Sequence, residues 1–201
     1  MLDAAIELFG QHGRDATTRL IAALADVNAP AVTYYFGSKE ELYRACATDI
    51  SEQIKAQLQP VLAEARSALD NRPSTGEIRA ALVTILDAIV DMLFAPEAER
   101  WVLFVIREQV EPSEAFEIIY AAMLPVLQTL TALIGYLQKP ATSHSEAALL
   151  AAGLYGQLVS YRLNRAALAR LPGPSSLQAS LPESIKALTQ RQVEGLFPRE
   201  G

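Results

Sequence analysis

Hydroxyl, phenol and cationic side chains gather between residues 17 and 39 of the chain. Such groups contact phosphate oxygens in protein–DNA complexes, and a helix N-terminus adds its own positive end. One short segment is therefore predicted to bind phosphate, although tyrosines there could instead close a small domain and a lysine could simply be solvated. The residues are Thr17, Thr18, Arg19, Tyr34, Tyr35 and Lys39.

Two short helices with a tight turn between them would position these side chains. Thr17 or Thr18 can cap the first helix and Asn28 the second. Pro30 then falls in a first helical turn, where its missing N–H costs nothing. The order predicts a helix-turn-helix, whose second helix enters the DNA major groove.

Apolar residues behind this motif would steady it. Leu20, Ile21 and Leu24 are expected to face inward from the first helix of the motif, and Val32 and Phe36 from the second. A capping-box sequence beginning at Ser38, with Glu three residues later, then starts a long helix. Pro60 could kink or break that helix.

The exposed face of the second helix is short of polar side chains. Ala29, Pro30, Ala31 and Thr33 would lie there, and Asn28 at the cap is the only amide. Without Arg, Lys or Gln, the helix cannot form the bidentate guanine or adenine contacts that usually dominate readout. We therefore predict recognition by apolar contact, hydroxyls and DNA shape.

Charge limits the affinity expected from this segment. The chain carries 17 Lys and Arg against 23 Asp and Glu, a formal net charge of −6, which argues against a general polyanion binder. Residues 1–50 hold four cations and seven anions, a net of −3. Affinity from counterion release should be modest and its salt dependence shallow.

Helical spacing of apolar residues recurs along almost the whole chain, and strand-like alternation is nearly absent. The expected fold is all-α with about nine helices. We expect a three-helix domain over residues 1–46 and a larger helical domain over residues 47–201. The first part is too small to fold well alone, so it should dock on the remainder through the long fourth helix.

The larger domain carries aromatic residues on three neighbouring predicted helices. They could line an apolar cavity in which two charged groups orient a small molecule, or they could form an ordinary core with the charges paired at the surface. The candidate ligand-binding residues are Phe94, Trp101, Phe104, Arg107, Glu108, Phe116, Tyr120 and Met123.

Small residues cluster between Ser145 and Arg165, and small side chains let helices approach closely. This segment and the last helix could form a four-helix interface between two subunits, or merely complete the core of one. The candidate interface residues are Leu150, Gly153, Leu154, Gly156, Gln157, Ser160, Ile185 and Leu188.

Other functional classes find little support in the sequence. His12 and His144 are the only histidines, and neither has the spacing of a metal ligand or a catalytic triad, so we expect no enzyme, metal or cofactor. Residues 118–138 lack charge, but polar residues, a proline and a glycine interrupt them, which favours a core helix over a membrane span. The single cysteine, Cys46, and the absence of a signal-peptide pattern predict a cytoplasmic protein.

Residues 36–42, Phe-Gly-Ser-Lys-Glu-Glu-Leu, resemble the tetracycline-repressor (TetR) family of transcription regulators. The likeness extends back through residues 4–13, 16–22 and 27–36. The segment from Arg107 to Tyr120, ahead of a proline-bearing helix, is similar to the CecR-type subgroup. The resemblance implies a homodimer that binds a palindromic double-stranded DNA operator and is released by a small apolar or aromatic effector.

Asp26 departs from the family pattern, because a glycine is usual at this position of the turn. Aspartate tolerates a left-handed backbone better than most residues, so the turn can still form. Its carboxylate, the acidic charge and the cation-free recognition helix leave an alternative open: a TetR-like ligand-binding or interaction module with degenerate DNA binding.

Overall fold

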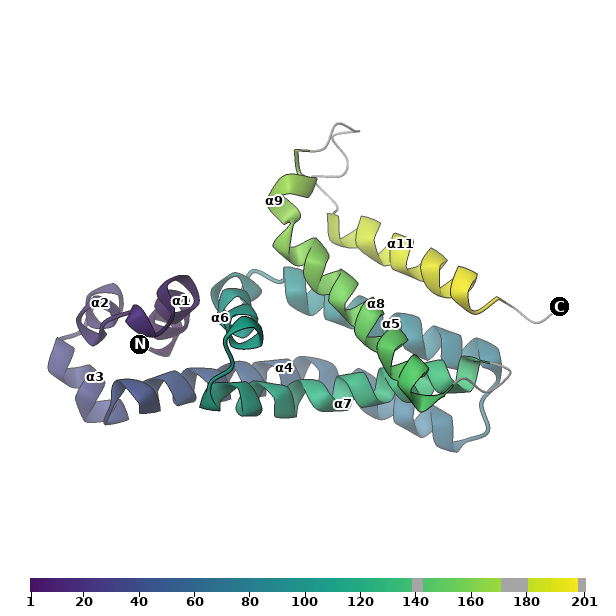
Figure 1. Cartoon of the computed structure of the whole chain (residues 1–201), viewed down its shortest axis with the longest axis horizontal. Coiled ribbons are helices and arrows are strands. Elements are labelled where there is room, and N and C mark those ends of the chain that lie inside the picture. Colours follow the sequence, from purple (N-terminus) through teal and green to yellow (C-terminus); the bar gives the residue numbers. More distant parts are fainter. Residues whose placement is uncertain (139–142, 171–180, 199–201) are drawn as a thin grey trace. The chain divides into compact units, whose positions relative to one another are not determined.

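The computed structural model describes residues 1–138, 143–170 and 181–198. Within these ranges the secondary structure is helical and contains no strand, which confirms the all-α prediction (Figure 1). The helices are α1 Leu2–His12, η1 Gly13–Asp15 (a 3-10 turn), α2 Thr18–Leu24, α3 Ala29–Phe36, α4 Lys39–Asp70, α5 Thr75–Phe94, α6 Ala98–Val110, α7 Glu114–Leu137, α8 His144–Leu163, α9 Arg165–Leu168 and α11 Leu181–Leu196.

Packing divides the chain into two compact units. The first joins residues 1–55 with residues 95–123, so that α6 and the start of α7 pack with the N-terminal helices. The second joins residues 56–94 with the chain from residue 124 onward. A functional boundary at residue 46 stays a prediction.

An aromatic cluster lies at the centre of the first unit. The Tyr43 ring on α4 meets Phe9 of α1 edge-on at 4.8 Å between centroids, and Phe104 of α6 at 4.6 Å. All three side chains are buried. Aromatic pairs of this kind add to the free energy gained from burial alone, so this cluster joins α1, α4 and α6.

The expected burial of Leu20 and Leu24 in α2 is wrong. Their side chains are 46% and 50% exposed, whereas Ile21 is fully buried. A seven-residue helix has one face toward its core, and Ile21 with Ala22 fills that face. Leu20 and Leu24 share the i, i+4 spacing of a buried stripe but lie on another side.

In the second unit, α5 carries the apolar stripe that fills the core, and α8 and α11 both pack on it. Capping fixes the start of α5: Glu77 and Ser74 exchange side-chain and backbone hydrogen bonds, which lowers the pKa of Glu77 below its ordinary value. Near the same end of α5, Arg79 donates from its guanidinium to the carbonyl oxygens of Phe197 and Pro198.

Neither helix that holds an internal proline breaks there. Helix α4 runs through Pro60, with Leu58 and Leu62 buried on either side of it. Helix α7 likewise runs through Pro125. Among the helices that the structure describes, α7 is the one whose length and composition would allow it to cross a membrane. Half of its apolar window is buried inside the protein, as is common for a core helix.

Candidate nucleic-acid interface

Local hydrogen bonds build the α2–turn–α3 motif as the sequence predicts. The Thr17 hydroxyl accepts from the Leu20 N–H at 3.2 Å, and the Asn28 side-chain oxygen accepts from the Ala31 N–H at 3.0 Å. Asp26 has a left-handed backbone with φ of 53°. The turn therefore forms without the usual glycine, as expected for aspartate.

Helix α3 is held on one side and exposed on the other. Val32 is buried and Phe36 is half-buried, which agrees with their expected orientation toward the core. Gly37 ends the helix with φ of 79°, and a Cβ there would collide with the Glu41 carboxylate. The Glu41 side chain could move aside, but the positive φ still favours glycine at the junction between α3 and α4.

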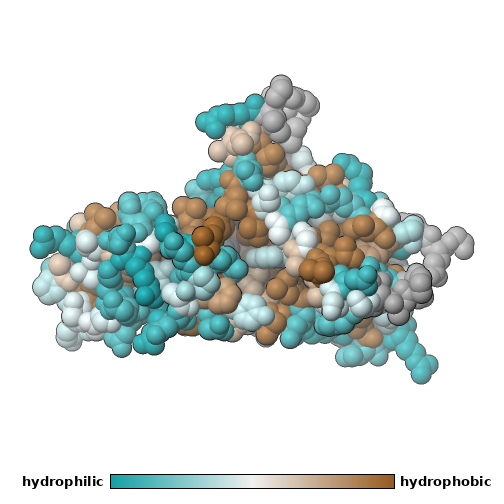
Figure 2. Space-filling model, viewed as in Figure 1, coloured by the Kyte–Doolittle hydropathy of each residue, from teal (hydrophilic) through white to brown (hydrophobic). Residues whose placement is uncertain are grey.

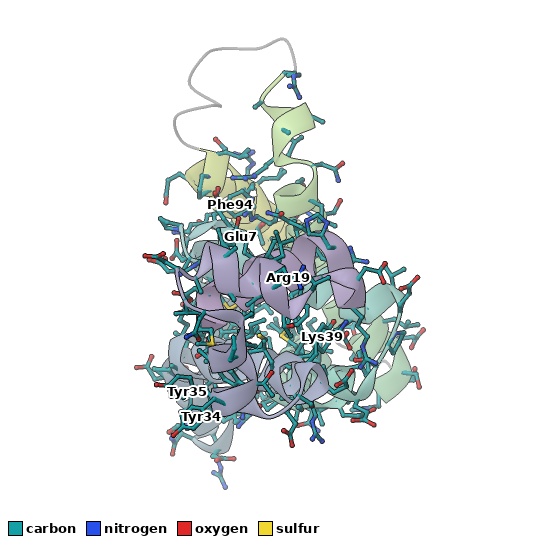
Figure 3. The ribbon with its side chains drawn as sticks, turned by 90° about the vertical axis from the view of Figure 1, so that its left-hand side faces the viewer. Glu7, Arg19, Tyr34, Tyr35, Lys39 and Phe94 are labelled. Carbon is teal, nitrogen blue, oxygen red and sulfur yellow. The ribbon has the colours of Figure 1, made fainter. Side chains whose placement is uncertain are left out.

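Two tyrosines dominate the exposed side of α3. Tyr34 is 83% exposed and Tyr35 is 70% exposed, with ring centroids 5.2 Å apart in an edge-on arrangement. Figure 3 shows them next to each other at the surface. The alternative in which they close the small domain as half-buried rings is therefore wrong, and both phenols are accessible.

The remaining base-facing candidates are also accessible. Ala29, Pro30 and Thr33 are exposed, and Ala31 is half-buried. Arg19 and the cap residue Thr17 are exposed at the start of α2. The positions of α2 and α3 predicted from sequence to contact DNA are thus exposed or half-buried, and their contact with DNA stays a prediction.

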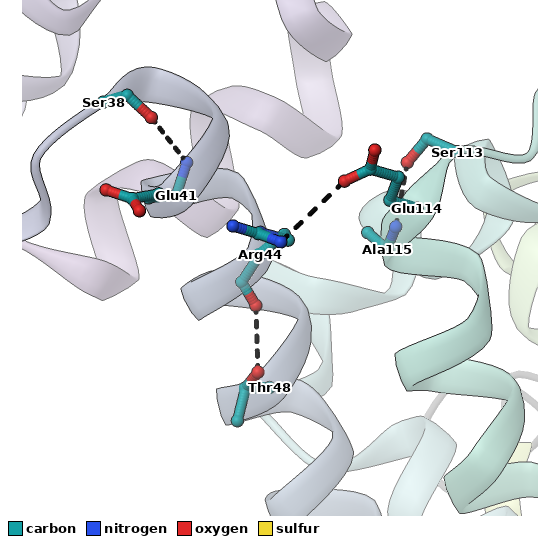
Figure 4. Close-up of polar contacts among 7 residues, drawn as sticks. All are labelled: Ser38, Glu41, Arg44, Thr48, Ser113, Glu114 and Ala115. Atoms are coloured by element: carbon teal, nitrogen blue, oxygen red, sulfur yellow. Dashed lines mark hydrogen bonds and ion pairs between the residues drawn. The ribbon is translucent and has the colours of Figure 1, made fainter.

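Two cations of this unit, Lys39 and Arg44, have protein partners. Lys39 donates from Nζ to the Arg14 carbonyl oxygen at 2.6 Å. The Arg44 guanidinium lies 3.9 Å from the Glu114 carboxylate at the start of α7 (Figure 4). Both contacts are exposed, so each side chain can exchange its partner at little cost.

Helix α6 is tied to the C-terminal end of α1. Arg107 donates from its guanidinium to the carbonyl oxygens of Gly10 and Gln11 at 3.4 and 3.2 Å. The two helices approach so closely that a Cβ at Gly10 would lie 3.2 Å from Leu103 and from the Phe104 backbone. Sequence reasoning missed Gly10, because nothing in its local sequence marks a helix crossing.

A buried carboxylate ties α6 to α4 and α7. Glu108 is 1% exposed and accepts hydrogen bonds from the Tyr43 hydroxyl at 2.6 Å and from the Ser113 N–H and hydroxyl at 3.1 and 2.8 Å. Burial and this contact with Glu108 raise the pKa of Tyr43 above its ordinary value. Tyr43 therefore stays a proton donor, and its part in this network was not foreseen from the sequence.

The predicted ligand-binding residues fall into two groups. Trp101, Phe104 and Met123 are buried in the first unit, where the Phe116 and Tyr120 rings stack with centroids 5.7 Å apart. The side chains of Arg107 and Glu108 form hydrogen bonds with other groups of the protein. Phe94 belongs to the second unit, where the Arg162 guanidinium lies 6.0 Å from its ring centroid. A ligand role for these residues stays a prediction.

A surface groove of about 690 Å³ lies elsewhere, between α5 and α11 of the second unit. None of the predicted ligand-binding residues lines it. Its lining is Thr75, Gly76, Arg79, Ala80, Val83, Thr84, Gln190 and Glu194.

One face of α8 is exposed and carries small residues. A Cβ at Gly153 or Gly156 would meet no atom within 4 Å, and Leu149 is 72% exposed. Figure 2 shows hydrophobic surface in brown where α8 lies in Figure 1. This face of α8 is exposed in the single chain.

The other predicted interface residues are divided between surface and core. Ser160 is exposed, Leu150 and Leu188 are half-buried, and Leu154 and Ile185 are buried within the unit. Gln157 donates to Gln192 of α11 at 2.7 Å, so α8 and α11 are already joined inside one chain. Leu154 and Ile185 thus contribute to the core, as the alternative reading of this segment allowed.

Comparison with known proteins covers both parts of the chain. Residues 1–46 match the family described as bacterial regulatory proteins, tetR family, and residues 76–196 match the C-terminal domain of the HTH-type transcriptional dual regulator CecR. The CecR protein of Shigella flexneri is 33% identical over 167 residues, which cover 82% of this chain and 75% of that protein.

Solved structures of similar fold are distant in sequence. AibR in complex with isovaleryl coenzyme A and operator DNA is 14% identical, with a TM-score of 0.68 and coverage of 99% of this chain and 97% of its own. FadR from Bacillus subtilis in complex with stearoyl-CoA is also 14% identical, with a TM-score of 0.60 and coverage of 100% and 97%. At this identity the likeness shows the fold.

Proposed function

Because the chain belongs to the tetR family of bacterial regulatory proteins and carries a CecR-type C-terminal domain, we propose that it binds a palindromic operator as a homodimer and is released by a small effector. The exposed outer face of α3, with Tyr34 and Tyr35 accessible above a buried Val32, carries this proposal. A helix that packs against its own domain on one face and exposes the other face can enter the major groove.

Phosphate contacts would fix the register of this helix. We assign them to the Thr17 and Thr18 hydroxyls at the N-terminus of α2, to Arg19, to the phenols of Tyr34 and Tyr35, and to Lys39 after release from the Arg14 carbonyl. The residues assigned to base edges or to the start of α3 are Asn28, Ala29, Pro30, Ala31 and Thr33.

The homodimer would form through the open side of α8, with α11 beside it. Gly153, Gly156 and Ser160 lie exposed there, and their small side chains would let two copies of α8 approach closely. Leu149 would add apolar area at one end of the strip. Two subunits joined in this way present two copies of α3, as a palindrome requires.

An effector with an apolar acyl or aromatic part suits the aromatic residues of α6 and α7. The bound ligands named for AibR and FadR are acyl thioesters of coenzyme A, which supports an apolar acyl portion. Helix α6 would transmit binding, because Arg107 holds the end of α1 and Glu108 holds Tyr43 of α4. A shift of α6 would then move the helices that carry the α2–α3 motif.

A second candidate function is a ligand-binding module that has lost DNA binding. The net charge of −3 over residues 1–50 and the engagement of Lys39 with a backbone carbonyl favour it. Both features reduce the electrostatic attraction to DNA on which non-specific binding depends.

Removal of one phenol separates the two functions. We expect Tyr34→Ala to weaken binding to duplexes of the intergenic DNA beside the gene by about fivefold, and by a similar factor for every sequence, because a phosphate hydrogen bond contributes about 1 kcal/mol. Lys39→Ala should act in the same direction. The measurement is a fluorescence anisotropy titration at low salt.

Val110→Ala is the matched control, since Val110 is also highly exposed in the first unit but lies on α6. It should leave the affinity unchanged. Failure of the unaltered protein to bind any of these duplexes would favour the module without DNA binding. Equal affinities for Tyr34→Ala and the unaltered protein would remove Tyr34 from the interface.

A further inference from the structure

We propose that α3 reads its operator half-site through the C5-methyl groups of thymines, and not through hydrogen bonds to guanine or adenine. The inference rests on the proposed DNA binding and concerns which base feature is recognised. It follows from the side chains that α3 exposes and from the contacts that already occupy Asn28 and Lys39.

The exposed surface of α3 is made of methyl, methylene and ring groups. Ala29, Pro30 and Thr33 are exposed, followed by the two tyrosines. From Ala29 to Phe36 the helix contains no charged side chain and no amide. Its hydrogen-bonding groups are three hydroxyls, and a single hydroxyl contacts either kind of base edge without strong discrimination.

The nearest amide is committed to the helix itself. Recognition of adenine by asparagine is bidentate and requires both the side-chain oxygen and the side-chain nitrogen. In this structure the Asn28 oxygen accepts the Ala31 N–H at 3.0 Å as the N-cap of α3. Asn28 cannot make the bidentate contact without uncapping the helix that would carry it into the groove.

The cation that follows α3 in the chain is directed away as well. Lys39 lies beyond the C-terminal end of α3, and its Nζ binds the Arg14 carbonyl oxygen between α1 and α2. Base contacts in this docking mode come from the N-terminal part of the recognition helix. A guanine contact from Lys39 would therefore need a different docking of the motif.

Thymine offers the partner that such a surface can use. Its C5-methyl group is the apolar feature of the major-groove edge, and alanine and threonine methyl groups are among its usual contacts. Burial of one methyl group changes an equilibrium constant by about fourfold. Several methyl contacts in each half-site would then supply most of the preference for the operator.

The test begins with selection of binding sites from random DNA duplexes by the full-length protein. Each thymine of the selected half-site is then replaced by uracil, which removes only the methyl group. We expect two or more positions per half-site at which uracil weakens binding by about threefold to fivefold. Cytosine and 5-methylcytosine compared at those positions should differ in the same direction.

A protein-side change assigns the contact to α3. Thr33→Ser removes one methyl group and keeps the hydroxyl, so the penalty for uracil should fall toward onefold at one position of each half-site. Thr48→Ser, the same change at an exposed position of α4, should leave every uracil penalty as it was.

The outcomes separate the two levels of the proposal. Absence of any selected sequence would overturn the proposed DNA binding. A selected palindrome that is insensitive to uracil, or whose binding is lost when guanine N7 is replaced by carbon, would leave DNA binding intact and overturn thymine-methyl recognition.

Discussion

Gly153→Glu should convert the protein from a dimer to a monomer and weaken binding to a full palindrome by about 100-fold. In the single chain, a Cβ at this exposed position would meet no atom within 4 Å, so we expect the monomer to accept a side chain there. Between two copies of α8, two carboxylates would be forced together without a partner. The loss of affinity follows because the second half-site no longer binds intramolecularly.

Gly135→Glu on α7 is the matched control for this change. It introduces the same charge at another helical glycine whose Cβ would also meet no atom within 4 Å. Mass measured by light scattering, together with anisotropy titration of the palindrome, should show a dimer with normal affinity for this control. A dimeric Gly153→Glu protein would show that α8 is not the interface.

Glu108→Ala should lower the free energy of unfolding by about 3 kcal/mol, because three donors lose their acceptor inside the first unit. The Tyr43 hydroxyl and both Ser113 donors have no other hydrogen-bond partner as close as this carboxylate. The same change should weaken the link from α6 to α4, so an effector would release DNA less completely. Urea unfolding followed by circular dichroism measures the first effect.

Glu111→Ala, at the exposed C-cap that follows α6, should change the unfolding free energy by less than about 0.5 kcal/mol. Tyr43→Phe should cost about 1 kcal/mol, since one hydrogen bond is lost while the ring packing is kept. If Glu108→Ala proved as stable as the unaltered protein, the carboxylate would not hold α6 in place. It would then be available for the effector, as the sequence first suggested.

Local chemistry accounts for what the sequence predicts well. Thr17 and Asn28 cap the helices that follow them, and Asp26 takes the left-handed turn, because each of these depends on neighbours within four residues. The same locality explains the wrong orientation of Leu20 and Leu24. Their spacing is helical, but only the fold decides which helical stripe faces the core.

Tertiary contacts account for what the sequence could not predict. Tyr43 and Glu108 are 65 residues apart, and no pattern around either residue points to the other. Arg107 and Glu108 look like groups that orient a ligand, yet the fold uses them to hold α1 and α4. Pro60 looks like a helix end, but buried leucines on both sides of it keep α4 continuous.

Local and tertiary contacts together shape the surface that α3 offers to thymine. Helix α3 begins at a cap that occupies its only nearby amide, and it ends at Gly37 in a backbone conformation suited to glycine. Between these ends it presents small apolar groups and tyrosines. The composition of α3 is already clear from the sequence, whereas the structure shows that Asn28 and Lys39 beside it are engaged in hydrogen bonds.

The most direct test of DNA recognition by α3 is a hydroxyl-radical footprint of the full-length protein on the intergenic DNA beside its gene. We predict two protected half-sites related by a two-fold axis, with centres separated by about one helical turn of DNA or a multiple of it. Protection should weaken at both half-sites for Tyr34→Ala. A footprint without symmetry, or no protection at low salt, would contradict recognition of DNA through α3 of a dimer.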